Sequence, residues 1–321
     1  MPTSADHASP MNAAGYASRR VTKPPNWHGL VALDMLFNNM TTGLFLVAAV
    51  GELMSRATFG PLARLAYPLA LLFLTIDLAC LVLDLGHRFR FHHMLRVFKP
   101  TSPMSLGTWS LTAYSLPLGL LATIEVLAML GIGGVAGWVR TVVIVLGIPF
   151  AMGSAMYKGV LFSTTSQPGW KDGRWLGGHL TNSAIAIGCA EFLAIAAVWG
   201  QGPISAIRTS LLVLLAINLA FLARLIGEFR PALRSLEGGG RLESVLIAGG
   251  ATAIGLPAAL LATSSWLRGS GAVDLAAVLL ILAGNLLVRW AIVMLPHREA
   301  TGRVSFCGPA EDGLEIGETT S

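Results

Sequence analysis

Ionisable side chains interrupt stretches of this sequence that are otherwise apolar. Asp34, Asp77 and Tyr157 lie within or at the end of such stretches. A charged group inside a membrane costs several kcal/mol, so each carboxyl needs a partner, water or a function. Aspartate and tyrosine side chains are suited to exchanging protons with a bound molecule. The residues therefore indicate a proton-exchanging site, unless Asp34 or Asp77 only neutralises Arg289 or Arg224.

These side chains fall at one predicted depth. At about 1.5 Å per helical residue, Asp34 lies about five residues from the N-terminal side of its helix. Asp77 lies about six residues from the same side on the next helix, which runs the opposite way. Tyr157 ends the fourth apolar run at that side, and His28 precedes the first. We expect one polar layer near a single membrane face.

Two further carboxyls lie deeper, toward the opposite face. Glu125 and Glu191 belong to the third and fifth apolar runs. Together with Asp77 and Asn218 they would form a proton path across the membrane. The alternative is that both are protonated carboxyls with hydrogen bonds to neighbouring helices. On the sixth run, Arg224 and Glu228 are spaced for a local ion pair.

The composition requires a membrane around these residues. Of 321 residues, 54% are hydrophobic and 12% are charged, and the mean hydropathy is +0.67. Soluble domains carry about 25% charged residues. Transmembrane segments that form no closed barrel must be helices. A run of about 20 apolar residues is long enough for a helix to cross the membrane. Eight such runs occur, near 29–54, 62–83, 107–130, 138–157, 176–198, 205–228, 244–266 and 272–295.

We therefore predict an all-α integral membrane protein with eight transmembrane helices. Residues 27–298 form this domain, flanked by a disordered tail at 1–26 and a disordered acidic tail at 299–321. Fifteen Lys and Arg residues fall on the N-terminal side and five on the other. The positive-inside rule then places both termini in the cytoplasm of a bacterial inner membrane. A net charge of +5 concentrated in loops indicates topology and no nucleic-acid partner.

The cysteines and histidines do not suggest bound metal. Cys80, Cys189 and Cys307 have no Cys or His at metal-site spacing. The seven histidines lie in loops or at helix ends on the N-terminal side, so no histidine pair lies in mid-membrane. One haem between His28 and His179 is geometrically conceivable. We expect no haem or iron–sulfur cluster in this chain.

The most specific pattern is the segment 83–109, LDLGHRFRFHHMLRVFKPTSPMSLGTW. It resembles the signature of the NrfD/polysulfide reductase (PsrC-like) membrane-subunit family, which runs close to LDLGRPxRFWxMLxxFNPTSPMSxGAW. The sequence departs from it at His87-Arg88 and at Lys99. Weaker similarity occurs at Thr42-Gly43, in the segment 157–161 with Pro168 and Trp170, and at 287–290. The resemblance thus spans the chain, with its specificity in the signature loop 84–107.

The resemblance implies two four-helix bundles and a site for menaquinone or ubiquinone near one membrane face. In the family, polar residues of the first helix and the tyrosine after the fourth contact the quinone. The matching positions here are Asp34, His28 and Tyr157, and Asp77 lies at the same level. The resemblance also implies a ferredoxin-like [4Fe-4S] partner, which connects to a catalytic molybdopterin enzyme or multihaem cytochrome.

Four cations of the signature loop form a basic patch: Arg88, Arg90, Arg96 and Lys99. Given the resemblance, we expect the patch to dock the ferredoxin-like subunit, a class of protein that is usually acidic. The alternative is that these residues set topology and meet anionic lipid. In the same loop, Ser105 is a candidate cap for the third helix.

The sequence favours a quinone-binding membrane anchor of a respiratory oxidoreductase complex. Such a subunit exchanges electrons between the quinone pool and an iron–sulfur partner, and is not catalytic alone. The alternative is a proton-coupled secondary transporter, since Pro117, Pro149 and Pro257 would interrupt helices. No clear repeat between the two halves supports that alternative. A third possibility is an anchor whose quinone site has decayed.

Overall fold

The fold is a bundle of membrane-length helices. A computed structural model describes residues 27, 29–85, 87–167, 169–199, 202–236, 238–266 and 271–297. Within these ranges, eight helical segments are long and apolar enough to cross a membrane, and this confirms the predicted all-α membrane fold. Six single-helix spans come first: α1 (Gly29–Met54), α2 (Arg56–Asp84), α3 (Pro103–Met129), α4 (Gly137–Ser163), α5 (Leu176–Trp199) and α6 (Ile204–Ser235). The seventh joins α7 (Gly239–Gly250), the π-helical turn η5 (Ala251–Gly255) and α8 (Leu256–Trp266), and the eighth is α9 (Gly271–Met294).

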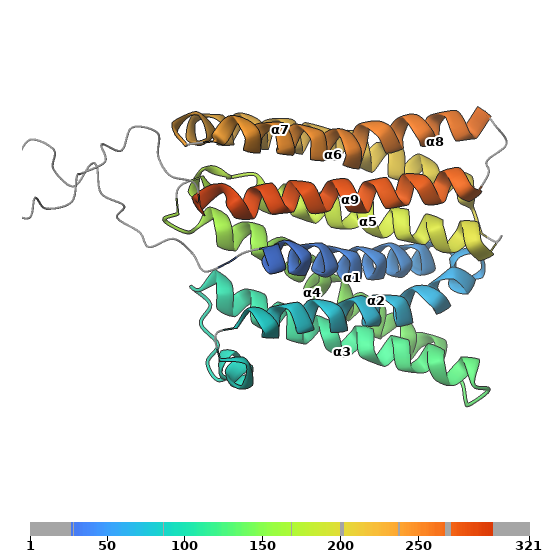
Figure 1. The fold of residues 1–321 in the computed structure, drawn as a ribbon. Helices are drawn as coiled ribbons and strands as arrows, with labels where there is room; N and C mark the ends of the chain where they lie inside the picture. The colour runs from blue at the N-terminus through green and yellow to red at the C-terminus, as the bar shows by residue number, and fades with distance from the viewer. Residues whose placement is uncertain are drawn as a thin grey trace, which may run out of the picture.

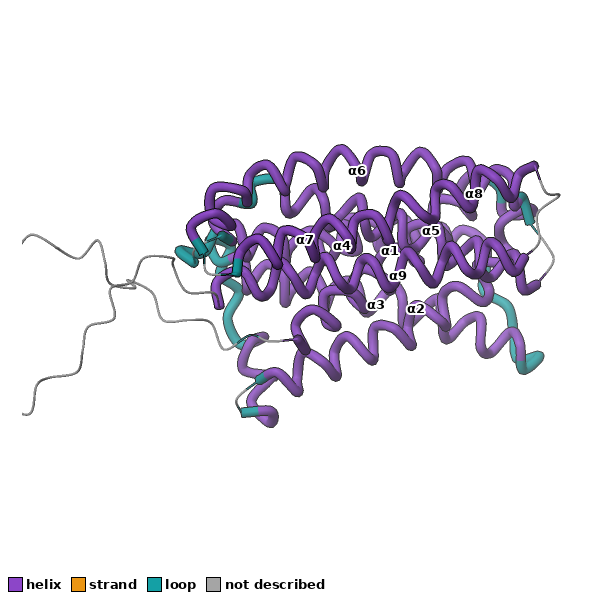
Figure 2. Tube along the Cα trace, turned by 45° about the horizontal axis from the view of Figure 1, so that its top comes forward, coloured by secondary structure: helices purple, strands orange, loops and turns teal. Residues whose placement is uncertain are grey.

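The spans form two four-helix groups that meet along α1 and α5. Helices α1 to α4 pack in one ring, and α5, α6, the seventh span and α9 pack in another. In Figure 1, α2 and α3 lie on one side of α1, and α6 to α8 lie beyond α5 and α9. Figure 2 shows the same helices running side by side, with loops only at the two ends of the bundle. Helix α1 contacts α2, α4, α5 and α9, and is therefore the centre of the molecule.

Small residues allow α1 and α5 to approach closely. A Cβ atom on Gly43 would overlap the main-chain carbonyl of Ala184, and one on Gly188 would overlap the backbone of Gly43. Close approach through small residues is the usual way in which membrane helices associate. The resemblance at Thr42-Gly43 therefore falls on the contact that joins the two helix groups.

Of the three prolines predicted to interrupt helices, only Pro257 lies beside a change in helical geometry. Helices α3 and α4 continue past Pro117 and Pro149, so the expected interruptions there are wrong. Pro257 instead follows the π-helical turn η5, where the seventh span changes its hydrogen-bond register. Gly284 of α9 leaves room for the backbone of Ala253 in that turn.

Several predicted boundaries are too short, and one of these errors concerns the site. Helix α4 ends at Ser163 rather than at residue 157, so Lys158 belongs to the helix and not to the following loop. Short helices fill the connections at this end: η3 (Arg88–Leu95) in the signature loop and η4 (Trp170–Asp172) before α5. At the same end, η6 (Leu295–His297) follows α9. The predicted tails at 1–26 and 299–321 lie outside the described residues.

Candidate functional site

Three helices bring two carboxyls to one lysine at the predicted polar level. The Lys158 Nζ lies 2.9 Å from Asp34 Oδ2 and 3.2 Å from Asp77 Oδ1. It also donates a hydrogen bond of 3.1 Å to the main-chain carbonyl of Asp34. All three side chains are buried, and Asp77 is fully so. The lysine thus ties α1, α2 and α4 together near the N-terminal face.

Two neutral side chains extend this group. Asn38, one turn after Asp34 on α1, donates hydrogen bonds to Asp77 Oδ2 at 3.3 Å and to Ser154 Oγ at 3.1 Å. We call Asp34, Asn38, Asp77, Ser154 and Lys158 the Lys158 cluster. Oδ1 of Asp34 and Oδ1 of Asn38 are buried and have no hydrogen-bond partner in the described part of the chain. Both atoms can accept a hydrogen bond from a ligand or water, and the carboxylate oxygen of Asp34 can also bind a proton.

Tyr157 borders the cluster. Its ring centroid lies 5.6 Å from Lys158 Nζ, and the phenol interacts electrostatically with Lys158, Asp34 and Asp77. The ring occupies space that a side chain on Gly107 would fill, because a Cβ there would overlap it. Gly107 is the last residue of the signature segment 84–107 and lies in the first two turns of α3, so that segment and the tyrosine are structurally coupled.

Substitution of Gly107 by alanine tests this coupling. The added methyl group must displace the Tyr157 ring, whose neighbours in the cluster are closely packed. We expect a loss of stability of about 1–3 kcal/mol, measured by thermal unfolding of the purified protein. Gly119→Ala on the same helix is the control, since nothing lies within 4 Å of a Cβ at that position. Equal stability of the two variants would contradict the coupling.

The structure brings together three of the four predicted quinone residues. Asp34, Asp77 and Tyr157 lie in or beside the Lys158 cluster, whereas His28 lies outside the described residues. Sequence reasoning does not find Lys158, because it directly follows the predicted run near 138–157 and therefore counts as one of the fifteen cations on the N-terminal side. The suggested partners Arg289 and Arg224 were wrong, since the carboxyls pair with Lys158. The signal available in the sequence was the apolar segment 159–162, which continues the helix beyond the lysine.

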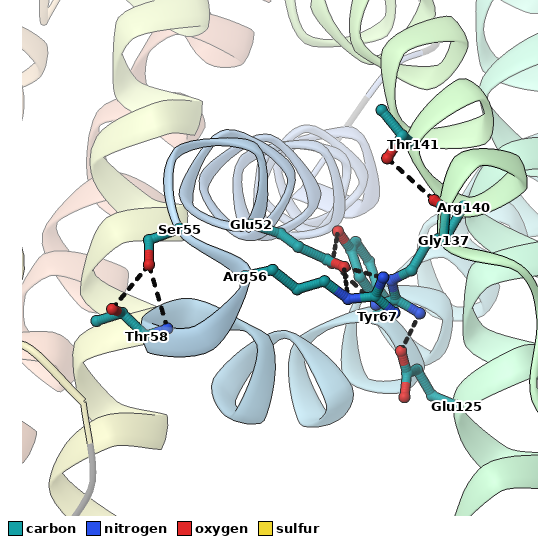
Figure 3. Close-up of polar contacts among 9 residues, drawn as sticks. All are labelled: Glu52, Ser55, Arg56, Thr58, Tyr67, Glu125, Gly137, Arg140 and Thr141. Carbon is teal, nitrogen blue, oxygen red and sulfur yellow. Dashed lines mark hydrogen bonds and ion pairs between the residues drawn. The ribbon is translucent and has the colours of Figure 1, made fainter.

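A second charged group lies toward the other end of the same helices (Figure 3). Arg140 of α4 binds both carboxylate oxygens of Glu52 and also pairs with Glu125 of α3. The Tyr67 hydroxyl donates to Glu52 at 3.2 Å, and Arg56 lies 3.6 Å from the same carboxylate. We call Glu52, Glu125 and Arg140 the Arg140 cluster. Glu125 is thus part of a buried ion pair, a state that neither sequence interpretation anticipated.

Glu191, the other predicted proton-path residue, is isolated. It is buried on α5, and neither carboxyl oxygen has a hydrogen-bond partner in the described ranges. Tyr114 of α3 interacts with it electrostatically, and the Tyr114 hydroxyl bonds to the main-chain carbonyl of Thr41 at 2.8 Å. In those ranges no hydrogen bond or ion pair joins Glu191 to Glu125. The hydrogen bonds expected for a structural carboxyl are therefore not found at Glu191.

The second helix group has its own buried polar residues. Arg289 of α9 is fully buried and donates to Asn285 Oδ1 at 2.7 Å and to Ser183 Oγ at 3.1 Å. Both ring nitrogens of His179 are buried without a hydrogen-bond partner in the described residues. Toward the opposite face, Arg208 pairs with Asp274 at 2.8 Å. These groups link α5, α6 and α9 without contributing to the Lys158 cluster.

The signature loop presents its cations outward at the Lys158 end of the bundle. Arg90, Arg96 and Lys99 are exposed, and the side chain of Arg88 is outside the described residues. Phe89 is 92% exposed and Phe98 is 57% exposed. The cap of α3 is Ser102, which accepts from the Ser105 N–H. The predicted cap, Ser105, instead accepts a hydrogen bond of 3.0 Å from the main-chain N–H of Lys99. This bond connects the end of the loop to the first turn of α3.

Comparison with known proteins agrees with the signature. A family model described as polysulfide reductase matches residues 17–301, which is most of the chain. A search of curated proteins found no match to the sequence.

Proposed function

The chain belongs to the polysulfide reductase family of oxidoreductase membrane subunits, and from that premise we propose that it binds a quinone at the Lys158 cluster. There it exchanges electrons between the quinone pool and an iron–sulfur partner subunit. The observation that carries the proposal is the pair of buried carboxyls, Asp34 and Asp77, held beside Tyr157 at one membrane level. Ionisable groups in a membrane interior commonly mark a functional site, and this supports the proposal.

The residues of the site suit a quinone chemically. A bound quinone supplies redox chemistry in which electron transfer is coupled to proton transfer. Asp34 Oδ1 is unpartnered and can hold a proton while Oδ2 remains with Lys158. The Tyr157 phenol can donate a hydrogen bond to a carbonyl oxygen. Lys158 fixes the position of both carboxyls. Its single positive charge balances only one of them, so a proton on the other would make the group neutral. Asn38 holds Asp77 in place through its amide.

The same proposal covers the partners and the location. Exposed Arg90, Arg96 and Lys99 of the signature loop lie at the end of the bundle that holds the Lys158 cluster. A ferredoxin-like [4Fe-4S] subunit docked on them would be close to the quinone, and would connect to a molybdopterin enzyme or multihaem cytochrome. We place the complex in a bacterial inner membrane with both termini cytoplasmic, since loop cations favour that side.

Glu191 is the residue that we propose to carry protons away from the site. It is buried without a hydrogen-bond partner in the described residues, and the Tyr114 phenol lies within electrostatic range of both Glu191 and Asp77. Glu125 would take part in this proton transfer only as a member of the Arg140 cluster, at the other end of the bundle. A Glu191→Gln variant is expected to slow proton uptake while quinone binding persists; normal turnover with unchanged proton uptake would end this part of the proposal.

The test is turnover of a water-soluble quinol by the purified complex. Asp34→Asn is expected to lower turnover by about 100-fold, as for the loss of a general acid–base group. Tyr157→Phe is expected to lower it about tenfold through the loss of one hydrogen bond. Glu243→Gln, which removes half of an exposed ion pair with Arg230, is the control. Full activity in both site variants would overturn the proposal and favour a structural anchor.

The transporter alternative predicts a different result. The isolated chain in vesicles would then carry a solute coupled to protons, and no iron–sulfur protein would copurify. The family match favours the oxidoreductase subunit. Copurification of a cluster-containing subunit, with no solute flux by the chain alone, is the result expected.

A further inference from the structure

A surface cavity lies in the second helix group, away from the Lys158 cluster. Its volume is about 350 Å³, within the range of roughly 300–1,000 Å³ found for small-molecule sites. The lining residues come from the α4–α5 connection and from α6: Lys171, Asp172, Arg174, Arg224 and Glu228. Five charged side chains thus converge on one hollow.

The three cations of this cavity are only partly balanced by its two carboxylates. In the described ranges, Lys171, Arg174 and Arg224 form no ion pair, although Arg230, two turns along α6, pairs with Glu243. The pair predicted between Arg224 and Glu228 does not form either. Glu228 instead accepts a hydrogen bond from the Trp175 N–H at 3.3 Å. Three cations and two carboxylates give the cavity a net charge of about +1.

The cavity lies where the bundle leaves the hydrocarbon of the membrane. Arg224 follows directly on the apolar run 211–223 of α6. One turn earlier, Phe221 packs against Trp175 with ring centroids 5.9 Å apart, and Trp175 is 47% exposed. Exposed tryptophans are typical of the headgroup level. The charged cavity is therefore next to the phosphate groups of lipids in that leaflet.

We propose that this cavity binds the headgroup of an anionic glycerophospholipid such as phosphatidylglycerol. Arg224, Lys171 and Arg174 receive the phosphodiester, whose single negative charge balances the excess cation. Asp172 and Glu228 accept hydrogen bonds from headgroup hydroxyls. Phosphatidylcholine and phosphatidylethanolamine carry no net charge, so neither balances the excess cation of the cavity. Basic pockets between membrane helices are known binding places for anionic lipids.

Native mass spectrometry of the full chain in mixed micelles tests the proposal. With phosphatidylglycerol present, one retained lipid per chain is expected, and phosphatidylcholine should not be retained. Arg224→Gln is expected to weaken retention about fivefold, and removal of all three cations about 100-fold. Arg230→Gln is the matched control on the same helix, because that arginine is already paired. It should retain the lipid as the unchanged protein does.

Two further measurements distinguish a lipid headgroup from free phosphate and show whether a variant is still folded. Inorganic phosphate at millimolar concentration should not displace the lipid; displacement would assign a soluble phosphate site and overturn the lipid proposal. Arg224→Lys keeps the charge and should restore most retention, which a misfolded variant would not. Equal loss in Arg224→Gln and Arg230→Gln, or equal retention of phosphatidylcholine, would also overturn it. None of these outcomes depends on quinone turnover, so this inference stands or fails independently of the proposed function.

Discussion

Replacing Lys158 with glutamine is expected to abolish quinone-linked turnover and to destabilise the first helix group. The substitution leaves the carboxyls of Asp34 and Asp77 buried next to each other without a cation. Removing one partner of a buried ion pair costs about 3–5 kcal/mol, because the remaining charge is uncompensated. Turnover should fall by at least about 100-fold, because the two carboxyls lose the group that holds them in position beside Tyr157.

The measurements are thermal unfolding of the purified complex and quinol turnover per folded complex. A double variant distinguishes the loss of the positive charge from the change in side-chain packing. Lys158→Gln combined with Asp77→Asn removes one carboxylate along with its cation. The double variant should recover most of the stability, and the coupling energy in the cycle measures the pair. Turnover should remain low in the double variant, because the proton-exchanging group is still altered.

Arg234→Gln is the control for Lys158→Gln. Arg234 is exposed near the end of α6, so its loss should change neither unfolding temperature nor turnover. A Lys158→Gln complex with unchanged stability and activity would show that the lysine is not the counter-ion of the two carboxyls. The proposed site would then lose the group that positions it.

The residues of the candidate site were predictable in part. Depth counting placed Asp34, Asp77 and Tyr157 at one level because helical rise is regular and apolar runs mark each span. It failed for Lys158, because a lysine beside a run end is ordinarily an interfacial residue. Only packing against α1 and α2 draws it inward. The pairing of charges between helices depends on how each helix is rotated about its own axis. The positions of apolar runs do not specify this rotation.

The Arg140 cluster illustrates the same limit. From sequence, Arg140 is one of the five cations on the far side of the membrane, and Glu125 is expected in a proton path or in hydrogen bonds between helices. They and Glu52 meet because α1, α3 and α4 pack in one ring. The eight spans themselves were correctly found, since hydropathy alone determines them. The π-helical turn in the seventh span was not predicted, because a change in hydrogen-bond register has no signature in composition.

Substitution of Arg140 by leucine should destabilise the protein as strongly as loss of Lys158, while sparing the chemistry. Two buried carboxylates, Glu52 and Glu125, would lose their shared partner, with an expected cost of about 3–5 kcal/mol. The Lys158 cluster is remote: Asp34 and Glu52 are separated by about 27 Å along α1. Quinol turnover per folded complex should therefore be nearly unchanged, while the unfolding temperature falls.

Arg64→Leu supplies the control, because Arg64 is exposed on α2 toward the same end and should affect neither quantity. Glu125→Gln added to Arg140→Leu removes one of the two stranded charges and should restore part of the lost stability. Arg56 lies 3.6 Å from Glu52 and partly compensates it, so Glu125 is the better residue to neutralise. If Arg140→Leu lowered turnover of the folded complex as much as Lys158→Gln does, the two clusters would not be separable. Proton transfer across the membrane would then pass through the Arg140 cluster.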